Sequence, residues 1–125
     1  MRIRSALLGV VLCAIGAVTV PVAGAFHFAL TKSTPAADSA VSSPDEVRLW
    51  FTQVPQQNSV AVRLISPTGD LVDTSDPRLD QADAKIVSVT VDRALRAGGY
   101  TVSWRGIGDD GHVVRGEFGF NVSAQ

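Results

Sequence analysis

Cysteine and methionine are almost absent from this chain of 125 residues, which contains one of each, Cys13 and Met1. Both lie in the first 25 residues, so the remainder of the chain has neither a disulfide nor a thioether metal ligand. A helical period is also missing, because beyond residue 25 no window keeps an apolar stripe at i, i+3, i+4 and i+7 over three turns. No basic patch stands out in the sequence, which excludes nucleic acid as the expected partner.

The one long hydrophobic run lies at the N-terminus. Arg2 and Arg4 precede residues 5–20, which carry no charge, and Ala23-Gly24-Ala25 supplies the small residues that a signal peptidase requires. The sequence therefore predicts a signal peptide over residues 1–25.

Cleavage at this point would leave a single domain over residues 26–125 in the periplasm or outside the cell, with no membrane attachment. The alternative is a retained membrane anchor, which Pro21 and the cleavage motif both disfavour. Cleavage would reduce the eleven Lys and Arg residues to nine against twelve Asp and Glu, so that the mature domain has a net charge of −3.

Apolar residues alternate with polar ones in several short runs, and turn residues such as Pro67 and Gly69 lie between the runs. The clearest runs are EVRLWFTQV, SVAVRLI, IVSVTVD, GYTVSWR and RGEFGFNV. Six or seven strands in about 100 residues predict an all-β Greek-key β-sandwich or small barrel. One helical turn is expected at residues 93–97. Trp50 is out of phase with its neighbours, which leaves two options, packing on the second face or exposure.

Few residues of the predicted domain suggest catalysis. No serine lies in a G-x-S-x-G motif, and the two histidines are too few for a closed structural zinc site. We therefore expect a binding protein and not an enzyme. The available side chains suit Cu(II) better than zinc, because imidazole nitrogens and carboxylate oxygens satisfy the tetragonal coordination of Cu(II).

Three residues are candidate copper ligands. His27 would be second in the mature chain, beside a free α-amine, and Asp110 and His112 are two residues apart near a predicted strand. In extended backbone this spacing sends both side chains to one face. The alternative is that residues 109–111 form a turn and His112 is simply exposed.

Four blocks follow one another along the chain: HFALTKSTPA, SPDEVRLWFTQ, LRAGGYTVSWRG and DDGHVVRGEFGFNV. Together they cover nearly the whole predicted mature chain. In sequence and in order they resemble the CopC family of periplasmic copper-resistance proteins.

This resemblance implies a cupredoxin-like or immunoglobulin-like β-barrel that binds one Cu(II) ion through His27, Asp110 and His112. It also implies a monomer that stores, buffers or delivers copper in copper homeostasis and resistance, with a membrane copper importer as a recipient.

Two features depart from the family pattern. Phe26 precedes His27, whereas in the tightest Cu(II) binders of the family histidine is the first residue after cleavage. The methionine-rich Cu(I) site of some members is absent, because Met1 would be lost with the signal peptide. An alternative function is therefore a CopC-like sandwich that has lost the metal and acts as an extracellular interaction module. A third possible function is oxidative copper chemistry on polysaccharides, which needs an extended flat surface for the substrate; the short chain offers little room for one.

Overall fold

The computed structural model describes residues 27–124; the predicted signal peptide and Phe26 lie outside them. Nine strands form this part of the chain, and three of them are only two residues long. In chain order the strands are β1 (Leu30–Thr34), β2 (Ala40–Val41), β3 (Glu46–Phe51), β4 (Ala61–Ile65), β5 (Leu71–Val72), β6 (Arg78–Leu79), β7 (Ile86–Thr90), β8 (Gly98–Ile107) and β9 (Val113–Val122).

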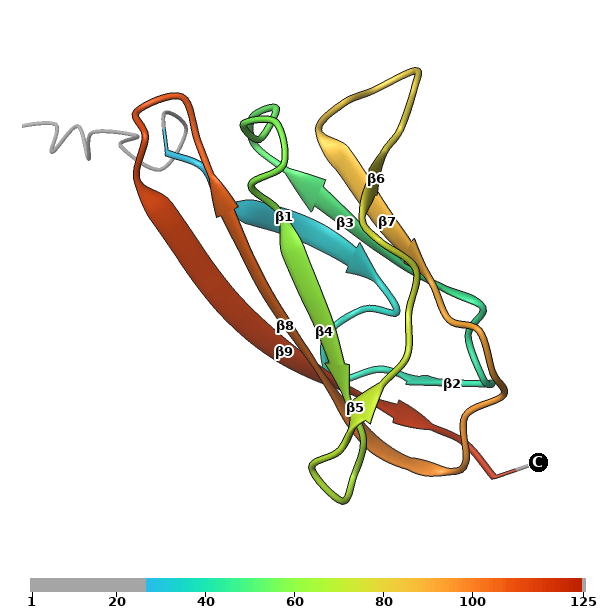
Figure 1. Cartoon of the computed structure of the whole chain (residues 1–125). Coiled ribbons are helices and arrows are strands. Elements are labelled where there is room, and N and C mark those ends of the chain that lie inside the picture. The colour runs from blue at the N-terminus through green and yellow to red at the C-terminus, as the bar shows by residue number, and fades with distance from the viewer. Residues whose placement is uncertain (1–26, 125) are drawn as a thin grey trace, which may run out of the picture.

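The strands form two sheets that face each other (Figure 1). One sheet has the order β1-β3-β7-β6 and the other the order β2-β9-β8-β4-β5. All neighbouring strands are antiparallel except β2 and β9, which are parallel. The predicted all-β sandwich is confirmed. Within residues 27–124 no helix is long and apolar enough to cross a membrane.

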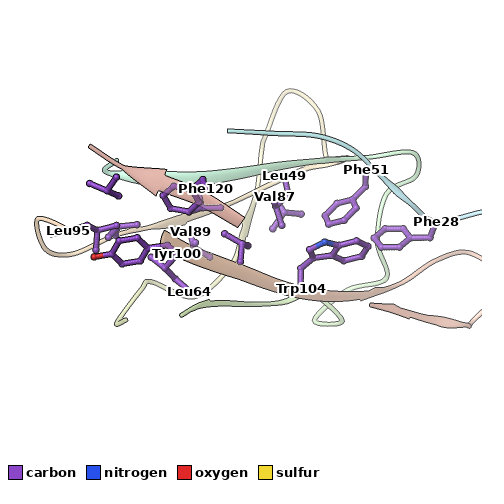
Figure 2. Packing of buried hydrophobic residues seen from close by; sticks show 14 residues of the cluster. Phe28, Leu49, Phe51, Leu64, Val87, Val89, Leu95, Tyr100, Trp104 and Phe120 are labelled. Atoms are coloured by element: carbon purple, nitrogen blue, oxygen red, sulfur yellow. The ribbon is translucent and has the colours of Figure 1, made fainter. Parts of the chain in front are cut away.

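The core lies between the sheets, where the period-two pattern places alternate side chains (Figure 2). On β3, for example, Val47, Leu49 and Phe51 are buried while the residues between them are not. The fully buried centre is made largely of valine and leucine, and aromatic rings lie toward both ends. At one end Tyr100 and Phe120 stack with their ring centroids 5.8 Å apart. The alternation read from the sequence thus identifies the buried face correctly.

The predicted helical turn at residues 93–97 is wrong, because this segment is irregular. Side chains anchor its backbone instead: Leu95 is buried, and its N–H donates to Ser43 Oγ at 2.7 Å. The Tyr100 hydroxyl donates to the carbonyl of Arg96 at 2.9 Å. These hydrogen bonds with side chains replace the backbone hydrogen bonds that a helical turn would supply.

Trp50 lies on the outer face of the four-stranded sheet and is half-buried. Its cross-strand partner is Lys32, whose Nζ is 4.5 Å from the Trp50 ring centroid. The indole is therefore covered by a long cationic side chain and not by the core.

Candidate metal site

Phe28 fixes the start of the described chain against one end of the sandwich. Its ring is buried, stacks on Phe51 with centroids 4.6 Å apart, and meets the edge of Trp104 at 6.4 Å. Two glycines leave space for it. A Cβ atom at Gly106 would lie 2.7 Å from Phe28 Cε1, and one at Gly108 would lie 2.6 Å from Phe28 Cβ. The segment that carries His27 therefore runs beside the end of β8.

Thr52, directly after β3, holds the backbone on both sides of Phe28. Its hydroxyl donates to the carbonyl of His27 at 2.6 Å and accepts from the N–H of Ala29 at 3.0 Å. Its own N–H donates to the carbonyl of Ala29 at 2.9 Å. The backbone of His27 is thus positioned by core packing and by hydrogen bonds together.

The turn between β8 and β9 lies next to this segment (Figure 1). The N–H of Gly111 donates to the carbonyl of Gly108 at 3.1 Å, and Gly111 has φ of +79°, a conformation that favours glycine. Two glutamines hold the turn from outside. Gln53 Oε1 accepts from the N–H of Asp109 at 3.2 Å, and Gln56 Nε2 donates to the carbonyl of Gly108 at 3.0 Å. The glutamines and Thr52 therefore tie the turn and the N-terminal segment to the same part of the fold.

Asp110 and His112 form a pair within this turn. Asp110 Oδ2 lies 2.9 Å from His112 Nδ1, and Asp110 Oδ1 accepts from the N–H of His112 at 3.1 Å. Two hydrogen bonds to His112 lower the pKa of the Asp110 carboxyl below its ordinary value of 3.8: the bond to the imidazole has the larger effect, and the bond from the backbone N–H has the smaller one. A smaller contribution to this lowered pKa comes from the nearby charge of His27. The carboxylate is therefore ionised at neutral pH.

The premise that residues 110–112 are extended is wrong, since Asp110 belongs to a turn and β9 begins only at Val113. The two side chains nevertheless meet, because the turn brings the carboxylate back to the ring two residues later. The expected turn is thus present, and His112 is exposed, with 82% of its side chain accessible. His112 is also paired.

Of the three predicted ligands, two are brought into contact and the third lies nearby. His27 is exposed, and its charge is close enough to act on Asp110. Among residues 27–124, no group of three or more His, Cys, Asp or Glu side chains is arranged so that it could hold a metal ion. The donor chemistry nevertheless fits Cu(II), because two imidazoles and a carboxylate are borderline and hard ligands of the kind that it takes. With Nδ1 engaged by Asp110, His112 has Nε2 available as a metal ligand.

The residues that support the site were not identified from the sequence. Thr52, Gln53 and Gln56 are isolated polar residues after a strand, and nothing in their spacing suggests a contact with residues about 25 or 55 positions away. Gly106 and Gly108 carry a weak signal, since glycines at the end of a strand often mark a close approach of another segment.

The fold and this end of the molecule define a class of protein: a small β-sandwich domain that presents two histidines and a carboxylate at one end of its sheets. The CopC domain model matches residues 30–123, and the chain belongs to the CopC family.

Individual proteins show the same similarity. Protein YobA of Escherichia coli strain K12 is 28% identical over 97 residues, which cover 77% of this chain and 78% of that protein. Copper resistance protein C of Xanthomonas campestris pv. juglandis is 30% identical over 101 residues, covering 77% of this chain and 80% of that one. The crystal structure of CopC from Methylosinus trichosporium OB3b superposes with a TM-score of 0.72 at 26% identity, over 79% of this chain and 96% of that chain.

Proposed function

We propose that this protein is exported and binds one Cu(II) ion at the end of the sandwich, with His27, Asp110 and His112 as ligands. The contact that carries the proposal is the hydrogen bond of 2.9 Å between Asp110 and His112, formed beside the segment to which His27 belongs. The metal is the cargo of the protein, which serves copper homeostasis by storing, buffering or delivering it.

The role in copper homeostasis is supported by the CopC family membership and by the similarity to copper resistance protein C. Binding and release require no catalytic group, so the proposed role is that of a carrier and not of an enzyme. A recipient such as a membrane copper importer is part of the proposal. An exposed site suits transfer, because a partner reaches the ion without opening the sandwich.

The geometry also supports a site that closes when the metal binds. The Asp110 and His112 side chains already lie together, and the backbone of His27 is held by Thr52 at 2.6 Å. Asp110 gives up its hydrogen bond to Nδ1 of His112 when both side chains turn to the same ion, so the site closes by side-chain rotation. Small rotations of exposed side chains cost little free energy compared with ordering a loop. We therefore expect binding without a change in the fold.

Calorimetric titration of the mature secreted protein with Cu(II) tests the site. We expect one ion per chain, and a loss of affinity of at least tenfold in His112→Ala and in Asp110→Asn, which corresponds to about 1.4 kcal/mol. Asp109→Asn is the matched control, because it removes the neighbouring carboxylate in the same turn. Equal affinity in the wild type and in His112→Ala would refute the ligand assignment.

Intact-mass measurement of the secreted chain determines whether it begins at Phe26 or at His27. A Phe26 terminus offers the Phe26 amine, the His27 amide and the imidazole, whereas a His27 terminus joins its own amine and imidazole in one chelate.

A folded wild-type domain that does not bind Cu(II) at micromolar concentration would instead favour the alternative function, that of an extracellular interaction module.

A further inference from the structure

Three arginines from three adjacent strands converge on the outer face of the five-stranded sheet. They are Arg63 on β4, Arg105 on β8 and Arg115 on β9. Arg105 and Arg115 are direct cross-strand partners, and Arg63 is opposite Ser103, two residues along β8 from Arg105. Cross-strand partners and residues two apart share a face, so all three side chains project from the same side of the sheet.

These side chains surround a surface cavity of about 220 Å³. Two small residues leave the space open: Ala61 is opposite Arg105, and Ser103 is opposite Arg63. The complete lining consists of Ala61, Arg63, Ser103, Trp104, Arg105 and Arg115.

None of the three guanidinium groups makes an ion pair or a hydrogen bond in the described part of the chain. Elsewhere arginines have partners: Arg48 pairs with Glu46 at 3.0 Å, and Arg93 pairs with Asp73 at 3.4 Å. The carboxylate of Glu117 is on the same face, opposite Ser103, but it forms no ion pair with any of the three.

Two arginines directly opposite each other on neighbouring strands repel and destabilise the sheet. A bound anion removes that repulsion and satisfies the unused donors. Guanidinium forks match the oxygen geometry of phosphate, which each of them binds through two parallel hydrogen bonds.

We propose that Arg63, Arg105 and Arg115 form a binding site for a phosphate group. The cavity of about 220 Å³ has room for a phosphate group. The group would be free phosphate or the headgroup of an anionic lipid. The lipid source is included because Leu71 and Val113, which are 66% and 50% exposed, flank the arginines on the same face.

Thermal unfolding of the copper-free protein tests the site, with inorganic phosphate added at constant ionic strength against sodium chloride. Phosphate raises the Tm of the wild type in a saturable manner. Arg115→Gln has a Tm at low ionic strength equal to or above that of the wild type, because the repulsion is gone, and its affinity for phosphate is at least tenfold lower. Arg93→Gln, which changes an arginine already paired with Asp73, retains the wild-type response.

Sedimentation with phosphatidylcholine vesicles, with and without phosphatidylglycerol, distinguishes the two sources. A response to phosphate in solution without vesicle binding supports a free anion. Vesicle binding that needs phosphatidylglycerol and is lost in Arg115→Gln supports a headgroup. The proposal is overturned if the wild type responds to neither probe, or if Arg115→Gln responds as the wild type does.

Discussion

The Cβ atom of Phe28 lies so close to Gly108 that a Cβ on that glycine would be only 2.6 Å away. Phe28 belongs to the core, while Gly108 begins the turn that carries Asp110 and His112. Packing of one side chain therefore determines how near the N-terminal segment comes to the turn. The proposed metal site depends in this way on the core of the sandwich, although its ligands are exposed.

Phe28→Ala is expected to lower the free energy of unfolding by about 3 to 5 kcal/mol, the usual cost of removing a buried phenylalanine. The loss follows from the cavity left beside Phe51 and from the loosened N-terminal segment. Urea unfolding, monitored by circular dichroism, measures this loss of unfolding free energy. Val54→Ala is the control, because Val54 is exposed and its truncation should change stability by less than about 0.5 kcal/mol.

Thr52→Val is expected to weaken Cu(II) binding and to lower the free energy of unfolding by about 1 to 3 kcal/mol, since the N–H of Ala29 loses its acceptor. The change preserves the shape of the side chain but also removes the donor to the His27 carbonyl. Titration calorimetry and urea unfolding give the two quantities. Thr31→Val is the matched control: it removes one exposed hydrogen bond to the Trp50 carbonyl on the same sheet and should leave copper affinity unchanged.

The ionised form of Asp110 is expected to stabilise the folded state. Its pKa in the folded protein lies below the ordinary value of 3.8, so the contribution is complete above that pH and is lost as the pH falls through the folded-state pKa. His112→Ala should raise the pKa of Asp110, because the side-chain hydrogen bond is the largest cause of the shift. The backbone hydrogen bond from residue 112 would remain, so the return to 3.8 should be incomplete.

Carbon-13 NMR of the carboxyl carbons, recorded in the metal-free protein during an acid titration, measures this pKa. An Asp110 resonance that titrates identically in wild type and His112→Ala would show that the pair does not form in solution.

The strands could be predicted because their side chains alternate and one face is buried. Leu49 and Val89 are in phase with their neighbours, and both are fully buried. The two-residue strands β2 and β6 could not be predicted, because two residues show no period. The irregular segment at residues 93–97 was missed for a related reason: its anchors, such as the hydrogen bond from Leu95 to Ser43, join residues 52 positions apart.

In the candidate site, too, the residues close together in sequence could be predicted, whereas the contacts between distant residues could not. Asp110 and His112 were identifiable because they lie two residues apart in a recognisable motif, and the structure pairs them. The supporting contacts from Thr52 and Gln53 depend on where β3 ends in space, which sequence spacing does not reveal. The arginine cluster on β4, β8 and β9 was missed as well, since its members lie on three separate strands and gather only when the sheet forms.

Gly116→Ala tests whether the glycine of the DDGHVVRGEFGFNV block has a packing role. Gly116 is opposite Trp104, and an added Cβ would lie 2.6 Å from Trp104 Cζ2. The buried indole would have to move, so we expect a loss of about 1 to 3 kcal/mol in unfolding free energy and a shifted tryptophan emission maximum. Gly119→Ala on the same strand is the control. Its Cβ would meet the nearest heavy atom, the carbonyl oxygen of Tyr100, at 3.5 Å, an ordinary contact, so stability should be kept. Equal losses in both variants would mean that backbone conformation, and not the indole, requires glycine at position 116.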